Sequence, residues 1–179
     1  MTHSSPVVLV LASGRGERFA ASGGTVHKLQ ALLRGQPVLQ HTLEAVRASG
    51  LPWHLEDAGH PGMGDSIAAA VRATRDAPGW LILPGDLPLI SPATLQAVAA
   101  ALARGEVVLP VCLGQRGHPV AFGAPCREEL LSLKGDRGAA QVVRSHVAIE
   151  LIVSDVGCIT DIDTLEDLQR AEALLAQRP

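Results

Sequence analysis

The chain has very few aromatic residues: of its 179 residues, two are Phe, two are Trp and none is Tyr. Proteins that bind single-stranded nucleic acid stack successive bases on aromatic side chains, and so few residues cannot build such a surface. The formal net charge is −3 at pH 7, and no long run of Lys or Arg supplies a basic patch. We therefore expect no nucleic-acid partner, and any anionic partner should be small.

Long apolar runs and paired cysteines are also missing. The apolar run at residues 7–12 is far shorter than the ~18 residues of a membrane span, so we expect no membrane insertion. The three cysteines, Cys112, Cys126 and Cys158, are widely spaced without a C-x-x-C pattern, which argues against a disulfide framework and a zinc site. They are typical of unpaired thiols in a reducing cytoplasm, where we expect the protein to work.

What the chain does contain is an alternation of short apolar runs with amphipathic stretches. Strands are predicted at residues 6–12, 53–56, 80–84, 106–111, 120–122 and 149–153. Helices are predicted at residues 37–49, 67–74, 92–104, 127–133, 137–145 and 164–176. This order is typical of an α/β fold with a doubly wound, mostly parallel sheet. With 47% apolar residues, residues 1–179 are expected to form a single domain.

The first candidate site is a glycine-rich loop after the first strand, within a long loop predicted at residues 13–28. It reads Leu11-Ala12-Ser13-Gly14-Arg15-Gly16-Glu17-Arg18-Phe19 and leads on to Lys28. Glycines let backbone N–H groups close on phosphate oxygens, and Arg15, Arg18 and Lys28 bring neutralising charge. Phe19 replaces the third glycine of a dinucleotide fingerprint, and no G-K-[ST] exists for a P-loop. The loop predicts a triphosphate site, although a solvated surface loop would show the same composition.

Two acidic segments predict a metal site. Asp86 lies in Gly85-Asp86-Leu87-Pro88, beyond the carboxyl end of a strand, where α/β proteins bind ligands. Asp161 and Asp163 lie on one side of an extended segment, so one could reach a metal while the other, or Thr164, caps the last helix. Magnesium is usually held by one or two carboxylates plus substrate phosphates. Each segment alone would also fit a simpler role, in a turn or a helix cap.

The third candidate site is a glycine-flanked helix start, Pro61-Gly62-Met63-Gly64-Asp65-Ser66. Gly62 and Gly64 would leave room for close approach of a ligand, and the start of a helix offers free N–H groups. Loop flexibility alone would explain the same glycines.

In this order, the motifs resemble the nucleotidyltransferases of molybdenum cofactor maturation over nearly the whole chain. Two further matching segments are Arg116-Gly117-His118-Pro119 and Gly135-Asp136-Arg137-Gly138. The resemblance is closest to the cytidylyltransferase branch, because of these segments and because Ala12-Ser13 stands where guanylyltransferases usually show two glycines. It implies a single Rossmann-like, GT-A-like nucleotidyltransferase domain. The chain departs from the family pattern after the helix predicted at 37–49, because residues 50–62 are too few for the strand and helix that the family places there.

The resemblance implies magnesium-dependent transfer of CMP from CTP to the terminal phosphate of molybdopterin bearing molybdenum, with release of pyrophosphate. The catalytic residues would be Arg18, Lys28 and Asp86. The nucleotide would be bound by Leu11, Ala12, Ser13, Gly14, Arg15, Gly16, Lys28, Gly62, Gly64, Ser66 and Asp86. Magnesium would be held by Asp86 with Asp161 or Asp163, and the pterin side would carry His118, Asp136 and Arg137. The resemblance also allows a client molybdoenzyme as a partner.

Three other functions stay open at this point. The donor could be GTP, the acceptor could be another phosphorylated compound, or the chain could be a non-catalytic chaperone that binds the nucleotide and the cofactor. The presence of Lys28, Asp86 and the pair Asp161 and Asp163 together favours an enzyme. A pure binding protein has no need of the whole set of metal and phosphate ligands.

Overall fold

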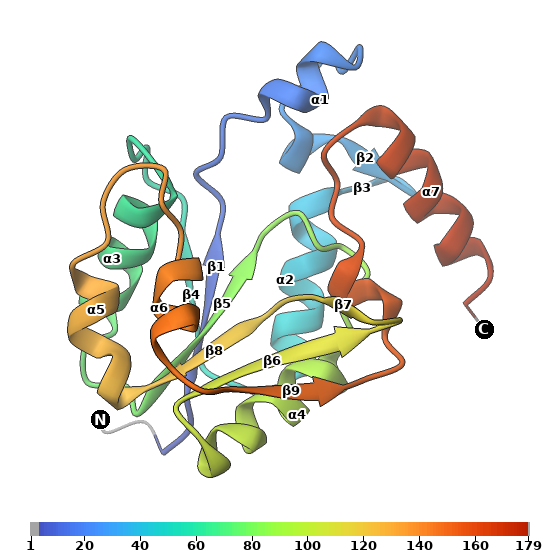
Figure 1. The fold of residues 1–179 in the computed structure, drawn as a ribbon. Coiled ribbons are helices and arrows are strands. Elements are labelled where there is room, and N and C mark those ends of the chain that lie inside the picture. Colours follow the sequence, from blue (N-terminus) through green and yellow to red (C-terminus); the bar gives the residue numbers. More distant parts are fainter. Residues whose placement is uncertain (1–3, 179) are drawn as a thin grey trace.

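A computed structural model describes residues 4–178 and contains a seven-stranded sheet with helices on both faces (Figure 1). From one edge, the strand order is β4 (Trp53–Glu56), β1 (Val7–Leu11), β5 (Gly79–Pro84), β8 (Val120–Gly123) and β6 (Val107–Cys112). Beyond β8, β6 also pairs with the short β7 (Gln115–Arg116) and with β9 (Ala148–Ile152). β4, β1, β5, β6 and β9 run in one direction, and β7 and β8 run opposite to them. This topology confirms the predicted α/β class with a mostly parallel sheet.

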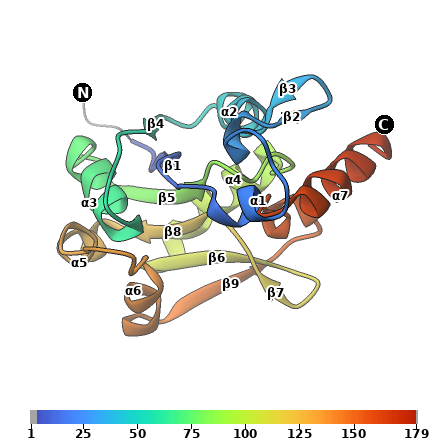
Figure 2. The ribbon, with the colours of Figure 1, turned by 90° about the horizontal axis from the view of Figure 1, so that it is seen from above.

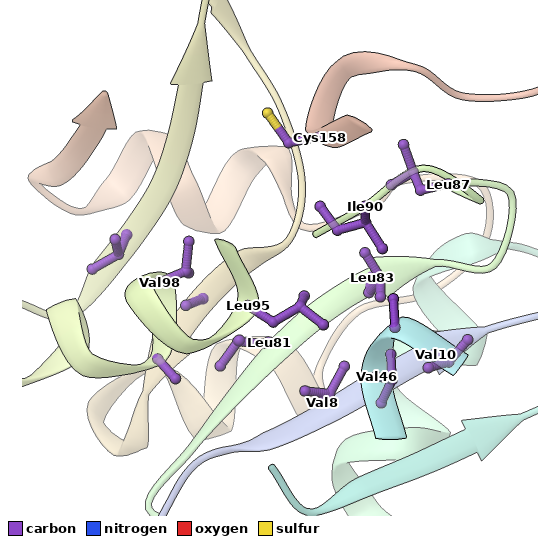
Figure 3. Close-up of a cluster of buried hydrophobic side chains, with 14 of the residues drawn as sticks. Val8, Val10, Val46, Leu81, Leu83, Leu87, Ile90, Leu95, Val98 and Cys158 are labelled. Atoms are coloured by element: carbon purple, nitrogen blue, oxygen red, sulfur yellow. The ribbon is translucent and has the colours of Figure 1, made fainter. Parts of the chain in front are cut away.

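Helices cover both faces of this sheet, as Figure 2 shows from above. They are α1 (Glu17–Ala21), α2 (Val38–Ala48), α3 (Met63–Ala73), α4 (Pro92–Ala101), α5 (Arg127–Leu131), α6 (Ala140–Ser145) and α7 (Leu165–Ala176). Val8 and Val10 of β1 pack in one apolar cluster with α2 and α4 (Figure 3). Val7 and Leu9 point to the other face and pack with α3, α5 and α6. The period-two alternation of a strand thus places successive residues of β1 in two separate cores.

A third apolar cluster joins α1, α7 and a small hairpin of β2 (Leu32–Leu33) and β3 (Gln36–Pro37). Figure 1 shows these elements together above the sheet, beside the end of β1. Phe19 of α1, Leu33 of β2 and Ile162, which precedes α7, are each at most 1% exposed. The cluster therefore fixes the segments that leave the sheet on the side where ligands are expected.

The predicted loop at residues 13–28 is wrong in part, because α1 lies inside it. This five-residue helix is too short to be stable alone, and burial of Phe19 in the third cluster supplies what local propensity lacks. The hairpin of β2 and β3 was not predicted, and α3 begins at Met63 rather than Ile67. The other predicted elements occur, with ends that differ by a few residues.

The region of residues 50–62 is short, as expected. β4 forms at its predicted position, and residues 57–62 then lead directly to α3 without a helix in between. Within residues 4–178, no helix combines the length and the apolar character needed to span a bilayer.

Three loops cross closely where the chain approaches Asp161. The turn at Val156–Ile159 lies against the backbone of Leu89 on one side and of Gly117 on the other. A Cβ atom on Gly157 would clash with the Leu89 carbonyl, and the His118 N–H donates to the Cys158 carbonyl (2.9 Å). The absence of a side chain at Gly157 therefore decides where the acidic segment enters the site.

We expect Gly157→Ala to lower the free energy of unfolding by about 1–3 kcal/mol, because the backbone of Leu89 must move to accept the methyl group. Gly59→Ala is the matched control, since a Cβ atom there meets nothing within 4 Å, and it should change stability by less than about 1 kcal/mol. Urea unfolding of both variants measures the difference. Equal stability of the two variants would contradict the close crossing.

Candidate functional site

A cavity of about 640 Å³ lies where β1 and β5 end, between the glycine-rich loop, α3 and the acidic segment. Its lining includes many of the predicted residues: Leu11, Ser13, Gly14, Arg15, Gly16, Arg18, Lys28, Gly62, Ser66, Asp86, Asp136 and Asp163. The predicted residues that do not line it are Ala12, Gly64, His118, Arg137 and Asp161. The structure thus brings together motifs that are more than 100 positions apart in the chain.

Three carboxylates lie together at one end of this cavity, and two of them, Asp86 and Asp163, line it. Asp86, Asp161 and Asp163 each offer an oxygen atom, and these atoms lie within 4.8 Å of one another. The Lys28 ammonium lies between two of them, with Nζ 2.7 Å from Asp86 Oδ2 and 3.1 Å from Asp163 Oδ1. Arg18 Nη1 lies 2.9 Å from Asp163 Oδ2. Two of the three predicted phosphate-binding cations, Lys28 and Arg18, therefore contact two of the predicted metal ligands, Asp86 and Asp163, directly.

The backbone around Gly85 fixes the position of Asp86. The Gly85 N–H donates to the Leu11 carbonyl (2.8 Å), and the Gly85 carbonyl accepts from Thr42 Oγ1 (2.8 Å). A Cβ atom at Gly85 would lie 2.9 Å from Leu39 Cδ1, so this close packing requires glycine. The Asp86 carbonyl then accepts from the Ile162 N–H (3.0 Å), which joins the two acidic segments through the main chain.

The buried Ile162 explains why both neighbouring aspartates reach the cluster. Its side chain points into the third apolar cluster, and in an extended segment Asp161 and Asp163 then lie on the opposite side. Helix α7 is capped by Thr164, whose side chain accepts from the Asp167 N–H while Asp167 accepts in return. Of the alternatives left open by the sequence, Thr164 is thus the capping residue, and neither aspartate is needed for it.

Electrostatics in the cluster favour a bound cation. Loss of hydration raises the pKa of Asp161, and the negative charges of Asp86 and Asp163 raise it further. Burial disfavours the charged form of Lys28, but the two carboxylates outweigh this effect and raise its pKa. Asp86 Oδ1 is buried and has no hydrogen-bond partner among the described residues. An unpaired buried carboxylate oxygen beside two other acids fits a hard divalent cation such as Mg²⁺.

The glycine-rich loop lies along the cavity next to this cluster. Gly16 adopts a left-handed conformation (φ 67°, ψ 27°) and precedes α1, while Arg15 is exposed. Such a conformation turns successive N–H groups toward one side and can form a concave anion site. The Ser13 hydroxyl hydrogen-bonds to the Ser66 hydroxyl, so the loop is tied to the first turn of α3.

The glycines at the start of α3 are required for packing within the chain, whereas from the sequence we expected them to leave room for a ligand. A Cβ atom on Gly62 would clash with the Gly135 backbone, and one on Gly64 would lie 2.6 Å from the Arg137 carbonyl. The close approach predicted for a ligand is therefore made first by the chain's own Gly135–Gly138 loop. That packing brings Asp136 to the cavity, whereas Arg137 does not line it.

His118 lies nearer to the carboxylates than expected for a residue of the acceptor side. Its side chain is half-buried, and this burial lowers its pKa, an effect that the charge of Asp86 offsets only in part. The imidazole is therefore neutral at neutral pH.

Sequence reasoning missed His60, which also lines the cavity. Its Nε2 lies 2.9 Å from Oε1 of Glu56, a buried carboxylate that His54 also contacts (3.2 Å). Burial alone would raise the pKa of Glu56, but the hydrogen bonds from the two histidines lower it. The only sequence signal was its position directly before the Pro61–Ser66 motif.

Comparison with curated proteins gives distant relatives. The purine catabolism protein PucB of Bacillus subtilis (strain 168) is 33% identical over 111 residues, which are 59% of this chain and 54% of that protein. The bifunctional protein GlmU of Azoarcus sp. (strain BH72) is 28% identical over 144 residues, which are 68% of this chain and 30% of that protein. The chain thus spans between about a third and about half of the length of these relatives.

Solved structures match the fold over nearly the whole chain. Rv0371c from Mycobacterium tuberculosis H37Rv has a TM-score of 0.79 and 26% identity, covering 97% of this chain and 100% of that one. Its complex with manganese has a TM-score of 0.75 at 24% identity, covering 96% and 100%. Molybdopterin-guanine dinucleotide biosynthesis protein A from Archaeoglobus fulgidus has a TM-score of 0.71 at 17% identity, covering 96% and 100%, which shows a shared fold alone.

The family model of the MobA-like NTP transferase domain matches residues 44–150, which is more than half of the chain. The matched region includes β5 with Asp86 and the cavity-lining part of α3. The mixed sheet, the carboxylate cluster and this match agree with an enzyme of the nucleotidyltransferase kind. The chain belongs to the MobA-like NTP transferase domain family.

Proposed function

We propose that the chain, as a single domain of residues 1–179, transfers CMP from CTP to the terminal phosphate of molybdopterin bearing molybdenum and releases pyrophosphate. The observation that carries this proposal is the meeting of Lys28, Arg18 and three carboxylates at one end of a cavity that a glycine-rich loop also lines. This arrangement suits a triphosphate with a divalent metal. The client molybdoenzyme and a cytoplasmic location stay predictions of the sequence.

The proposed roles follow from position in the cavity. The N–H groups of residues 14–16, together with Arg15, Arg18 and Lys28, bind the triphosphate, because they supply the donors and positive charge that phosphates need. Asp86 holds Mg²⁺ together with Asp161 or Asp163, and the unpaired Asp86 Oδ1 supports that assignment. The manganese in the Rv0371c complex supports a divalent metal in this fold. When bound, the metal supplies positive charge to the triphosphate.

The reaction is an in-line displacement at the α-phosphorus. An oxygen of the acceptor phosphate forms a bond to that phosphorus while the bond to the oxygen bridging toward the β-phosphate breaks, and pyrophosphate leaves with the electron pair. Positioning and charge neutralisation supply most of the rate, so no side-chain nucleophile is required. Lys28 and Arg18 neutralise the charge that develops on the leaving phosphates.

The two substrates occupy different parts of the cavity. The nucleoside lies along Leu11, Ser13 and the start of α3, where Gly62 and Ser66 line the cavity. Ala12 and Gly64 do not line it, and Gly64 instead packs against the backbone of Lys134 and Arg137. The pterin lies on the side of Asp136, which lines the cavity. Arg137 and His118 do not line it, and their role toward the pterin stays an expectation from the family resemblance. Ala12-Ser13 and the His118 and Asp136-Arg137 segments, which resemble the cytidylyltransferase branch, support cytosine as the base.

Base choice tests the proposal most directly. We expect CTP to be preferred over GTP by at least about tenfold in kcat/KM, or ~1.4 kcal/mol of transition-state binding. A panel of the four nucleoside triphosphates, assayed for pyrophosphate release with the molybdenum cofactor as acceptor, measures this preference. A preference for GTP would make the chain a guanylyltransferase. Turnover only with another phosphorylated compound would show that this compound, and not molybdopterin, is the acceptor. Nucleotide binding without turnover would indicate a chaperone.

Asp86→Asn should lower turnover by roughly 100-fold and shift the magnesium dependence to higher concentration, because Asn keeps the size but not the charge that a hard cation needs. A magnesium titration of pyrophosphate release measures both effects. The exposed Asp76→Asn is the control for the loss of one negative charge, and circular dichroism shows that both variants fold. An unchanged titration curve for folded Asp86→Asn would remove Asp86 from the metal site.

Lys28→Met should increase the affinity of the nucleotide-free protein for Mn²⁺ by about tenfold, because the ammonium that now neutralises Asp86 and Asp163 competes with a metal cation for them. Electron paramagnetic resonance of free Mn²⁺ measures this affinity without catalysis. Lys134→Met removes the same charge outside the cluster and should leave the affinity unchanged. Weaker Mn²⁺ binding by Lys28→Met would contradict a metal site shared with this lysine.

A further inference from the structure

The part of the glycine-rich loop from Ser13 to Gly16 has few contacts with the rest of the described chain. A Cβ atom at Gly14 would meet nothing within 4 Å, and α1 has no side-chain cap at Gly16. The Ser13 hydroxyl contacts Ser66, and the Gly16 carbonyl accepts from the Ala20 N–H of α1 (3.1 Å). The Gly14 carbonyl between them is held by a hydrogen bond from His27. The conformation of the Gly14–Arg15 peptide therefore depends on His27.

The hydrogen bonds of His27 determine which ring nitrogen carries the proton. The Leu29 N–H donates to His27 Nδ1 (3.3 Å), so Nδ1 is an acceptor and has no proton. Nε2 then carries the proton and donates it to the Gly14 carbonyl (2.5 Å). His27 is also the N-cap of the turn at Lys28–Gln30. One imidazole thus joins the turn that presents Lys28 to the glycine-rich loop.

The direction of this bond decides what the loop presents to the cavity. Gly14, Arg15 and Gly16 line the cavity, whereas His27 does not, so the Gly14 carbonyl is turned away from it. In a planar trans peptide, the carbonyl and the following N–H point in opposite directions. The Arg15 N–H therefore points away from His27. If this peptide were flipped, a carbonyl oxygen would replace the N–H and repel phosphate oxygens.

We propose that His27 is a positioning residue, which holds the Gly14–Arg15 peptide with its N–H available to the triphosphate and sets the spacing between that N–H and Lys28. The inference rests on the proposed triphosphate site and adds a residue that touches neither substrate. A Cβ atom built on Gly16 would lie 3.5 Å from the side chains of both His27 and Lys28, so this part of the loop passes beside both residues, as the role requires.

The test compares the binding of CTP and of cytidine by isothermal titration calorimetry in the presence of Mg²⁺. His27→Leu, which keeps the bulk but not the donor, should weaken CTP binding by about tenfold or more, the scale of one hydrogen bond to a charged group. Cytidine binding should stay within about twofold, since it has no phosphates to contact the loop. The KM for CTP should rise with little change in kcat, because the N–H binds the ground state and transition state alike.

Two further variants separate positioning from packing. His27→Gln keeps a neutral donor of similar reach and should restore CTP binding to within about threefold of the unsubstituted protein. His41→Leu is the matched control, because His41 Nε2 also donates to a carbonyl, that of Leu33 (2.7 Å), away from the cavity. It should lower the Tm without changing CTP affinity.

The outcomes distinguish this inference from the proposed function. If the unsubstituted protein binds CTP no more tightly than cytidine, the triphosphate site and this inference both fail. If it binds CTP tightly and His27→Leu does so equally, only the role of His27 fails. Equal losses for CTP and cytidine, a Gln variant as weak as the Leu variant, or the same loss in His41→Leu would each show a packing effect and overturn the inference.

Discussion

The ion pairs of Lys28 with Asp86 and Asp163 connect the parts of the molecule on which the site depends. Three carboxylates at the end of one strand and the start of α7 would repel one another without a cation between them. Lys28 comes from the turn after the glycine-rich loop, so the same contact holds that loop against both acidic segments. The apolar cluster around Phe19 and Ile162 keeps these segments in place from the other side.

In this arrangement, the charged groups of the site do not all have partners within the described part of the protein. The Asp86 carboxylate is buried, yet one of its oxygens has no partner among the described residues, and such groups cost stability. The Lys28 ammonium is paired with two carboxylates that a metal would also bind. Under the proposed function, a triphosphate with its metal would satisfy the lysine and the carboxylates together, because it supplies negative and positive charge at adjacent positions.

Close crossings of backbone hold the walls of the cavity. The Gly135–Gly138 loop packs directly against Gly62 and Gly64. In the same way, the end of β1 packs against Gly85, and the loop of Leu89 packs against Gly157. Each crossing joins segments that are far apart in the chain, and each leaves no space for a Cβ atom. Hydrogen bonds from Thr42 and from the Ile162 N–H then fix Asp86 within this frame. Main-chain contacts thus set the positions of the cavity walls.

The sequence by itself determined the α/β class, most of the strands and helices, and the chain segments that form the cavity, because hydrophobic periodicity and turn residues act locally. It also predicted Asp86 beyond the carboxyl end of a strand, and Asp86 follows β5 and lines the cavity. It could not predict α1, the hairpin of β2 and β3, or the approach of His60, which depend on packing with distant residues. Tertiary structure alone decided that both Asp161 and Asp163 reach Asp86, because burial of Ile162 in a cluster built from separate segments sets the direction of its neighbours.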